Sequence, residues 1–267
     1  MRTIIAATDF SEIAENAVEY AAQIAKQING RLILFNSFVI PFHAGNTLLP
    51  ASTIQRLMTE NEIRLLERSY SLAYRHEIEV GHETSFSYLD KDLRELIAKY
   101  QAESLVLGMP NRTLEQDLWG NRTTAAIKRL KIPILAVPLG ARFEGSKRVL
   151  FACDVIQGVP EQIVSRIKEI VTTLDGEVEI FSVDQTIAHM HKGSDEINDG
   201  LEGINYYYKN VPSNAVIKEI EKEIESFQAD LLIMIPKSYG FWSSIVHRSK
   251  TRIMASGLKI PLLSIPI

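Results

Sequence analysis

The sequence from Leu105 to Pro138, LVLGMPNRTLEQDLWGNRTTAAIKRLKIPILAVP, decides which fold we expect for this chain. It predicts a buried strand, a loop punctuated by glycines, a helix that begins near Asn121, and a second buried strand. Such a loop can turn its backbone N–H groups toward an anion, and the helix N-terminus adds the positive end of its dipole. The residues that mark the loop are Gly108, Arg112, Gly120 and Arg122. They predict an anion-binding loop, although glycines at strand ends are also ordinary structural punctuation in α/β domains.

Length and composition predict two globular domains. A chain of 267 residues exceeds one ordinary domain of roughly 100–150 residues, and 46% hydrophobic content suffices for a sizeable core. A net charge of −4 lacks the basic excess that non-specific nucleic-acid binding requires, so we expect no nucleic-acid partner. The single cysteine, Cys153, excludes an intramolecular disulfide, and its apolar neighbours favour a core residue over a nucleophile. Because no basic-then-apolar leader precedes IIAATDF and no apolar run reaches about 18 residues, we expect a cytoplasmic protein without a membrane partner.

Strands alternate with helices along the first half of the chain. The apolar run TIIAAT is followed at once by Asp9, and Ser11 can cap a helix that ends before Asn29 and Gly30. Unbroken apolar strands are typical of a parallel sheet covered on both faces, where ligands bind at the carboxyl ends of the strands. Further strands are expected at residues 32–35, at 77–81, from residue 105 onward, and at 132–137. Further helices are expected at residues 51–74 and 89–100. The apolar side of the long helix comprises Ile54, Leu57, Met58, Leu65 and Leu66.

The second half of the chain repeats the first. Residues 140–147, GARFEGSK, form the linker that we expect between a first domain at 1–139 and a second domain at 147–267. KRVLFACD repeats RTIIAATD at an offset of 145 residues, GEVEIFS repeats GRLILFN at 146, FQADLLIMIP repeats YQAESLVLGM at 127, and KIPLLSIP repeats KIPILAVP at 128. The fall from 146 to 127 indicates that 19 residues are missing between the second and third strands of the second copy. We therefore expect its long helix to be shortened or absent and residues 184–203 to form a polar loop, in which His189 and His191 are too few for a metal site.

The residues quoted so far resemble the universal stress protein family in its tandem two-domain form. The opening IIAATDFSEIAENAVEYAAQIA, the glycine-led second strand and the closing strand IPILAVP carry this resemblance, which extends over essentially the whole chain. It implies an α/β fold with two Rossmann-like or flavodoxin-like domains of the adenine nucleotide alpha hydrolase-like kind. Each domain would hold a five-stranded, mostly parallel sheet flanked by helices. The two would pack as an intramolecular pseudo-dimer, and the resemblance leaves a homodimer of whole chains open.

The same resemblance implies a binding site for ATP or another adenine nucleotide, with Mg²⁺ if the nucleotide is bound. In nucleotide-binding members the last loop follows the pattern G-x2-G-x9-G-[ST], and an Asp after the first strand contacts adenine. Carried over position by position, the site comprises Asp9, Gly108, Asn111 in place of the second glycine, Gly120, and Asn121 in place of the Ser or Thr, with Arg112 and Arg122 beside them. The loop is one residue shorter than the pattern. Asparagine tolerates a left-handed backbone and caps helices well, so the two replacements weaken the match to the nucleotide-binding pattern but do not remove it.

The second copy departs further from the pattern, and neither copy predicts catalysis. Its equivalent positions are Ile235, Ser238, Arg248 and Ser249, so all three glycines are gone. Ile235 brings a β-branched side chain and Pro236 removes a backbone donor, which argues against a triphosphate site there. Pyrophosphatase and P-loop motifs are absent, as is any recognisable Ser/His/Asp set. Asp9 and its copy Asp154 are more typical of helix capping or adenine contact than of acid–base chemistry, so we assign no catalytic residue and at most weak ATP hydrolysis.

Two functions remain open from the sequence. The first is a stress-response regulatory protein that binds an adenine nucleotide in its first domain only. The second is a nucleotide-free scaffold of the same family that works through dimerisation and protein contacts. If the loop binds nucleotide, we expect Gly108→Val to abolish binding at little cost in stability, because the added side chain would lie at a loop edge.

The two closing strands, residues 132–137 and 260–265, form the last expectation. Each is apolar, and the resemblance to the family implies that each lies at the edge of its own sheet. An exposed apolar edge is an aggregation hazard that proteins cover or pair. We expect the two strands to meet in antiparallel fashion, as a pair related by a two-fold axis must. This pairing would bury Ile134, Leu135, Leu262 and Leu263.

Overall fold

The computed structural model of the chain describes residues 1–37, 50–85, 89–109, 126, 129–145, 147–153, 159–183, 200–236 and 258–267. Within these residues ten strands are present, five before residue 139 and five after it. By packing, the chain divides into two compact units, Met1–Gly108 and Met109–Ile267, and each is described by itself. The division falls before the fifth strand, whereas the predicted domains at 1–139 and 147–267 follow the duplicated sequence and stay a prediction.

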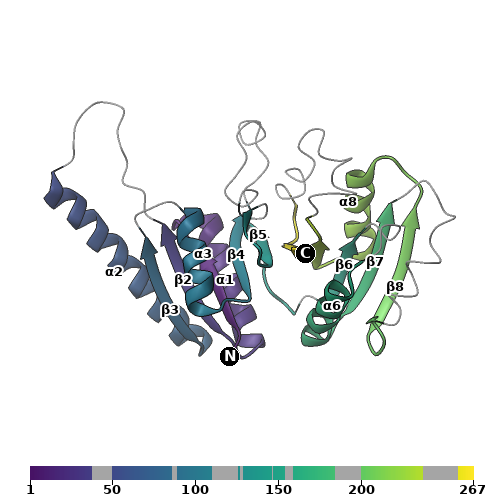
Figure 1. Cartoon of the computed structure of the whole chain (residues 1–267), viewed down its shortest axis with the longest axis horizontal. Helices are drawn as coiled ribbons and strands as arrows, with labels where there is room; N and C mark the ends of the chain where they lie inside the picture. Colours follow the sequence, from purple (N-terminus) through teal and green to yellow (C-terminus); the bar gives the residue numbers. More distant parts are fainter. Residues whose placement is uncertain are drawn as a thin grey trace. The chain divides into compact units, whose positions relative to one another are not determined.

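The first unit is a parallel sheet with the strand order β3-β2-β1-β4 (Figure 1). Crossovers between parallel strands are right-handed, and the chain moves outward from β1 to β3 before it returns to β4. The helices of the outward path, α1 and α2, therefore lie together on one face, where they contact each other, and α3 lies on the opposite face. The strands are β1 (Thr3–Ala7), β2 (Arg31–Ser37), β3 (Glu79–Ser85) and β4 (Ser104–Met109), and the helices are α1 (Glu12–Gln27), α2 (Ala51–His76) and α3 (Leu89–Tyr100).

Helix α1 confirms its prediction from the sequence. The hydroxyl of Ser11 accepts a hydrogen bond from the backbone N–H of Ala14 at 3.3 Å, as an N-cap residue should. The helix ends at Gln27, and Asn29 adopts a left-handed backbone with φ of 49° before Gly30. The apolar residues expected to face the sheet are all buried, namely Ala14, Val18, Ala21, Ala22 and Ala25.

Two details around α2 differ from the sequence-based expectation. The third strand begins at Glu79 and runs to Ser85 instead of occupying 77–81, because Glu77 has the left-handed conformation that ends α2. On α2 itself only Leu65, Ser69 and Leu72 are fully buried, whereas Ile54, Leu57, Met58 and Leu66 are half-buried. A helix of 26 residues is about 39 Å long and a seven-residue strand about 23 Å, so the first turns of α2 extend beyond the sheet.

The second unit has the strand order β5-β10-β9-β6-β7-β8. Strands β6 to β10 repeat the topology of the first copy, since β6 pairs in parallel with both β7 and β9, as β1 does with β2 and β4. Helix α6 follows the central strand and α8 follows the edge strand β8, so the handedness rule places them on opposite faces. The elements are β5 (Ile134–Pro138), β6 (Arg148–Ala152), α6 (Glu161–Leu174), β7 (Glu177–Val183), β8 (Asn205–Val211), α8 (Val216–Phe227), β9 (Leu231–Met234) and β10 (Leu262–Ser264).

The duplication extends to individual atoms. A Cβ at Gly30 would lie 2.8 Å from the carbonyl oxygen of Arg2, and a Cβ at Gly176 would lie 2.5 Å from that of Lys147. The residue after each glycine donates its N–H to the same carbonyl, at 2.9 Å and 2.7 Å. Both copies thus need glycine for the same close approach of two backbones.

The missing residues of the second copy also fall where the sequence predicts. Strand β7 begins 146 residues after β2, whereas β8 begins 126 residues after β3, so the chain is shortened between the second and third strands. Residues 184–199, including the predicted polar loop with its two histidines, lie outside the described residues. A shortened or absent long helix there stays a prediction.

The closing strands of the two copies pair as predicted. Strands β5 and β10 are antiparallel, with Leu135 opposite Leu263 and Ala136 opposite Leu262. All four residues expected at this join are buried, namely Ile134, Leu135, Leu262 and Leu263. The stretch 139–147 that follows β5 contains no helix or strand among its described residues, and Gly140 and Gly145 have φ of 83° and 102°. Such a backbone is typical of a connecting segment.

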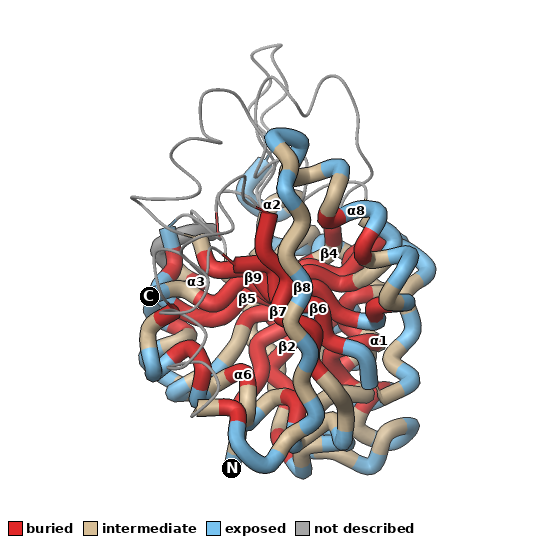
Figure 2. The backbone as a smooth tube through the Cα atoms, turned by 90° about the vertical axis from the view of Figure 1, so that its right-hand side faces the viewer, coloured by how far each residue is buried: buried red, intermediate tan, exposed pale blue. Residues whose placement is uncertain are grey.

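Burial follows the strands (Figure 2). Strands β2, β6 and β7 are buried over most of their length, whereas the edge strand β8 alternates between half-buried and exposed residues. Cys153, directly after β6, is 6% exposed and forms no disulfide, which agrees with the predicted core residue. None of the described helices is both long enough and apolar enough to span a membrane.

The β5–β10 pair yields a test. Leu135→Asp is expected to lower the free energy of unfolding by about 3 kcal/mol or more, because a carboxylate would replace a side chain that is 6% exposed. Leu139→Asp, just beyond the strand at 38% exposed, is the matched control and should cost less than about 0.5 kcal/mol. Urea denaturation of the full chain measures both values. Equally small losses for the two variants would contradict the importance of this pairing.

Candidate functional site

The carboxyl ends of β1 and β4 bring two predicted site residues together. These strands are parallel neighbours in which Ala6 pairs with Val106, so the same register places Thr8 level with Gly108. Asp9 follows directly and is exposed at this edge of the sheet. The remaining predicted site residues lie outside the described residues, namely Asn111, Arg112, Gly120, Asn121 and Arg122. The structure therefore describes only the part of the site that is formed by β1, β4 and the start of α1.

Asp9 shapes the turn between β1 and α1. Its Oδ1 accepts a hydrogen bond from the backbone N–H of Ser11 at 3.0 Å, and Ser11 in turn caps α1. An aspartate that bonds the backbone two residues ahead is a common turn-forming arrangement. Phe10 between them has φ of 61°, a left-handed conformation that is rare for an aromatic residue. The carboxylate thus lies at the N-terminus of α1, where the helix dipole favours negative charge.

Thr8 fixes this turn from the buried side. Its hydroxyl donates to Glu15 Oε1 at 2.7 Å and accepts from the backbone N–H of Phe10 at 2.9 Å. Its carbonyl oxygen accepts from Asn36 Nδ2 at 2.7 Å, and Asn36 Oδ1 accepts from Asn61 Nδ2 at 2.8 Å. Thr8 and Asn36 are both buried at the ends of their strands. Their hydrogen bonds hold the end of β1, the end of β2 and helix α2 in one arrangement.

Two arginines of α2 contact the β1–α1 turn and the helix that follows it. Arg68 donates from Nε to Glu15 Oε2 at 2.6 Å and from a terminal nitrogen to Glu19 Oε2 at 3.3 Å. The guanidinium of Arg64 lies over the ring of Phe10, 4.1 Å from its centre. The contacts Thr8–Glu15–Arg68–Glu19 therefore couple the β1–α1 turn and the first half of α1 to α2.

Glu19, midway along α1, is the last member of this chain of contacts. Its Oε1 lies 2.5 Å from Nε2 of His76, and its Oε2 accepts from Arg75 at 3.0 Å. Burial acts to raise the pKa of Glu19, but the hydrogen bond to His76 and the nearby charges of His76, Arg75 and Arg68 outweigh it and hold the pKa below the usual value. Sequence reasoning did not find this network. The available signal was a pair of polar residues, Thr8 and Asn36, at the ends of otherwise apolar strands.

Gly108 is required by packing, which corrects part of our expectation. A Cβ at this position would lie 2.7 Å from Cγ2 of Ile13 and 3.1 Å from its carbonyl oxygen, in the first turn of α1. A larger side chain would therefore push α1 away from β4 and would not simply fill a loop edge. The expectation that Gly108→Val would cost little stability is wrong, and this variant cannot separate ligand binding from folding.

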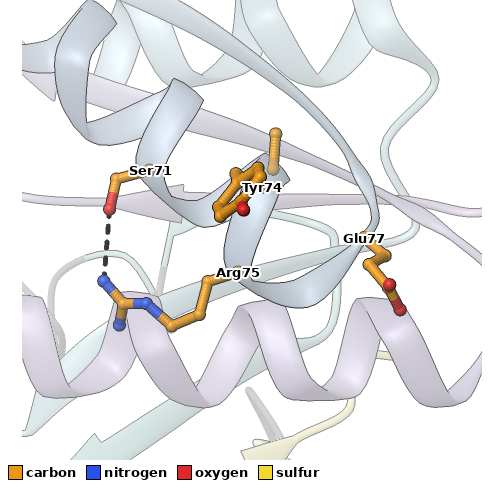
Figure 3. Close-up of a pocket in the computed structure, with 5 residues that line it drawn as sticks. Ser71, Tyr74, Arg75 and Glu77 are labelled. Carbon is orange, nitrogen blue, oxygen red and sulfur yellow. Dashed lines mark hydrogen bonds between the residues drawn. The ribbon is translucent and has the colours of Figure 1, made fainter.

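A cavity of about 770 Å³ lies elsewhere, at the C-terminal end of α2 (Figure 3). It is lined by Ser71, Ala73, Tyr74, Arg75 and Glu77, and Arg75 donates a hydrogen bond to Ser71 at 3.2 Å. Tyr74 is 91% exposed, so the hollow opens broadly to solvent. Helix α2 runs back from the carboxyl ends of the strands, so its last turn lies at the opposite edge of the sheet from Asp9. We assign no function to this hollow.

The described residues of the second copy differ from the first at the place of Thr8. Cys153 occupies the place of Thr8, since its N–H donates to Phe181 O at 3.0 Å as that of Thr8 donates to Phe35 O at 2.8 Å. A thiol is a weaker hydrogen-bond donor than the hydroxyl of Thr8. Ile235 is buried directly after β9. The other positions of this degenerate copy lie outside the described residues, namely Asp154, Ser238, Arg248 and Ser249. Across the described ranges no group of three or more His, Cys, Asp or Glu residues could hold a metal ion.

The parallel sheet, its helices and the turn at its carboxyl edge define a Rossmann-like α/β protein. The chain belongs to the universal stress protein family, because the sequence profile of that family matches residues 1–138, more than half of the 267 residues. No curated protein sequence matches the chain.

Solved structures show the same fold over the whole chain. A universal stress protein from Archaeoglobus fulgidus DSM 4304 is 16% identical with a TM-score of 0.76, over 99% of this chain and 98% of that one. A functionally unknown protein from Pseudomonas aeruginosa PAO1 is 12% identical with a TM-score of 0.62, over 100% and 92% of the two chains. A universal stress protein in complex with cAMP is 21% identical with a TM-score of 0.43, over 52% of this chain and 98% of that one. The first two similarities establish the tandem α/β fold.

The packing of Gly108 yields a second test. Gly108→Ala is expected to lower the free energy of unfolding by about 1–3 kcal/mol, because the added Cβ meets both the side chain and the backbone of Ile13. Gly81→Ala is the matched control and should cost less, since its Cβ meets only the flexible Cδ1 end of Ile33. Combining Gly108→Ala with Ile13→Ala should cost less than the two single changes together, because Cγ2 of Ile13 is gone. Full additivity in urea denaturation would show that the two residues do not compete for space.

Proposed function

We propose that the protein is a stress-response regulator that binds ATP or another adenine nucleotide at the carboxyl edge of β1 and β4 in its first half. The observation that supports the proposal is the register of β1 and β4, in which Ala6 pairs with Val106, because Asp9 after β1 and Gly108 in β4 then belong to the same edge of the sheet. A parallel sheet offers its ligand site at this edge. Regulation in the cytoplasm, without a nucleic-acid or membrane partner, is part of the proposal.

The chemistry of this edge suits an adenine nucleotide. The exposed carboxylate of Asp9 can accept a hydrogen bond from the adenine amino group while its turn keeps it in place. The loop from Gly108 to Arg122 offers backbone N–H groups and two guanidinium groups for the phosphates, and bound Mg²⁺ would reduce their charge. The buried contacts of Thr8 support the proposal further, because they fix the turn before any ligand arrives.

We further propose that only one nucleotide binds per chain. The second copy has lost all three glycines of the pattern, and Ile235 is buried where a phosphate or ribose would approach. Cys153 in place of Thr8 removes the hydroxyl that holds the turn in the first copy. Binding should therefore be asymmetric. Hydrolysis of the nucleotide is not part of the proposal.

A nucleotide-free scaffold is the second candidate, and particular contacts favour it. Gly108 is explained by its contact with Ile13, and Asp9 by its hydrogen bond to Ser11, so both residues have structural roles without a ligand. The loop is also one residue shorter than the family's pattern. In addition, the β5–β10 pair resembles the join between two chains, as expected of a protein that works by association. The partner would then be another protein.

Titration with ATP and Mg²⁺, after co-purified ligand has been removed, separates the two candidates. We expect one equivalent of ATP to bind per chain, measured by isothermal titration calorimetry. Asp9→Asn should weaken binding by about 10- to 100-fold, because it keeps the oxygen that accepts from Ser11 but replaces the remaining acceptor with a donor.

Asp154→Asn, the same change in the second copy, is the matched control and should leave the affinity unchanged. Gly120→Val tests the other glycine of the predicted loop and should also weaken binding. If the unmodified chain shows no heat of binding for ATP, ADP or AMP, the scaffold is favoured and the nucleotide proposal fails. Equal effects of the two aspartate changes would contradict the asymmetry alone.

A further inference from the structure

A pair of buried carboxyl groups lies in the second half of the chain, outside the site described above. Glu179 on β7 is 7% exposed and Glu223 on α8 is 5% exposed. The two carboxyl groups are close enough for Glu223 to raise the pKa of Glu179, and Oε1 of Glu179 is buried with no hydrogen-bond partner in the described part of the chain. Charged side chains are rarely buried to this degree unless they are paired with opposite charge. The pair therefore needs a physical explanation.

The surroundings of the pair supply one positive charge. Nζ of Lys209 on β8 lies 2.5 Å from Oε2 of Glu223, and 43% of the lysine side chain is exposed. Glu179 stands in register with Leu150 of β6 and Tyr207 of β8, and paired residues of parallel strands point to the same face. One lysine thus faces two buried carboxyl groups.

Other charged groups near this face have partners of their own. On the neighbouring turn of α8, Glu219 pairs with Lys222 at 2.9 Å. Glu177, two residues before Glu179, lies 3.5 Å from Nε of Arg148 on β6 and accepts a hydrogen bond from the Tyr207 hydroxyl at 3.2 Å. Among the charged residues that β6, β7, β8 and α8 bring to this face, Glu179, Glu223 and Lys209 therefore set the charge balance at the pair.

We propose that Glu179 and Glu223 share a proton and that this proton makes the packing of α8 on its sheet depend on pH. Two carboxyl groups can form a hydrogen bond only if one of them is protonated. With the proton present, the pair carries one negative charge, which Lys209 balances. Without it, two carboxylates share one lysine in a buried site, and like charges at short range repel strongly. Loss of the proton should therefore loosen α8.

The direction of the pH dependence follows from Glu179. Burial, the largest cause, and the nearby Glu223 together raise the pKa of Glu179 to about 7, although the charge of Lys209 acts to lower it. Between the ordinary value of 4.5 and about 7, the folded chain holds one proton that the unfolded chain has lost. The stabilisation from this pair is therefore complete below about pH 4.5 and is lost as the pH rises to about 7.

The experiment measures amide hydrogen exchange of the full chain at several pH values between 5 and 8, corrected for the intrinsic exchange rate. In the unmodified protein the opening equilibrium of α8 should rise by up to about tenfold per pH unit until about pH 7. Helix α6, on the opposite face, serves as the internal reference. Glu179→Gln keeps the shape of a protonated carboxyl group and should abolish the pH dependence of α8. Glu225→Gln on the exposed side of α8 is the matched control and should retain it.

Carboxyl carbon NMR gives a second readout that does not depend on a stable variant. In the unmodified chain Glu179 should titrate near pH 7, and in Glu223→Gln, which leaves Lys209 as its charged neighbour, the midpoint should fall by at least one pH unit. The proposal is overturned if Glu179 titrates near 4.5 in the unmodified chain. It is equally overturned if α8 opens with the same pH dependence in the unmodified protein and in Glu179→Gln.

Discussion

The pairing of the central strand of each copy with a parallel neighbour on both sides is the constraint on which the rest of the structure depends. Strand β1 joins β2 and β4, and β6 joins β7 and β9 in the same arrangement. A parallel strand can reach its neighbour only through a crossover, and the fixed hand of that crossover assigns each helix to a face. Because β1 runs parallel to both β2 and β4, its carboxyl end lies at the same edge of the sheet as theirs, and the polar turn after β1 is found at this edge.

The two copies use polar residues in their sheets in different ways. In the first copy, Thr8 and Asn36 are buried at strand ends, and their hydrogen bonds involve α1 and α2. In the second copy, Cys153 stands where Thr8 does and Ser182 where Asn36 does, and two buried carboxyl groups are present as well, Glu179 on β7 and Glu223 on α8. Duplication has therefore preserved the backbone contacts, such as those of Gly30 and Gly176, while the buried side-chain chemistry has diverged.

Much of this architecture could be predicted from the sequence, because it depends on local signals. Ser11 and the alternation of apolar runs predicted α1 and the parallel sheet, and the repeated blocks predicted the duplication and the antiparallel join of β5 and β10. Individual side-chain contacts between distant segments could not be predicted. The packing of Gly108 on Ile13 and the meeting of Glu179 with Glu223 depend on which strand and helix faces oppose each other, and no local pattern contains that information. The candidate site was predicted from the family resemblance, which named Asp9 but not the Thr8, Glu15 and Arg68 contacts behind it.

Cys153, which stands in the second copy where the first has Thr8, also gives the chain a natural thiol that can be labelled chemically. Cys153 is the sole thiol of the sequence and is 6% exposed at the end of β6. A buried thiol is shielded from alkylating reagents, so any labelling of the native protein must pass through an opening of the central strand of the second copy. The rate of labelling therefore measures the motion of this strand without an introduced probe, and it does so one residue before the position where the first copy carries Asp9.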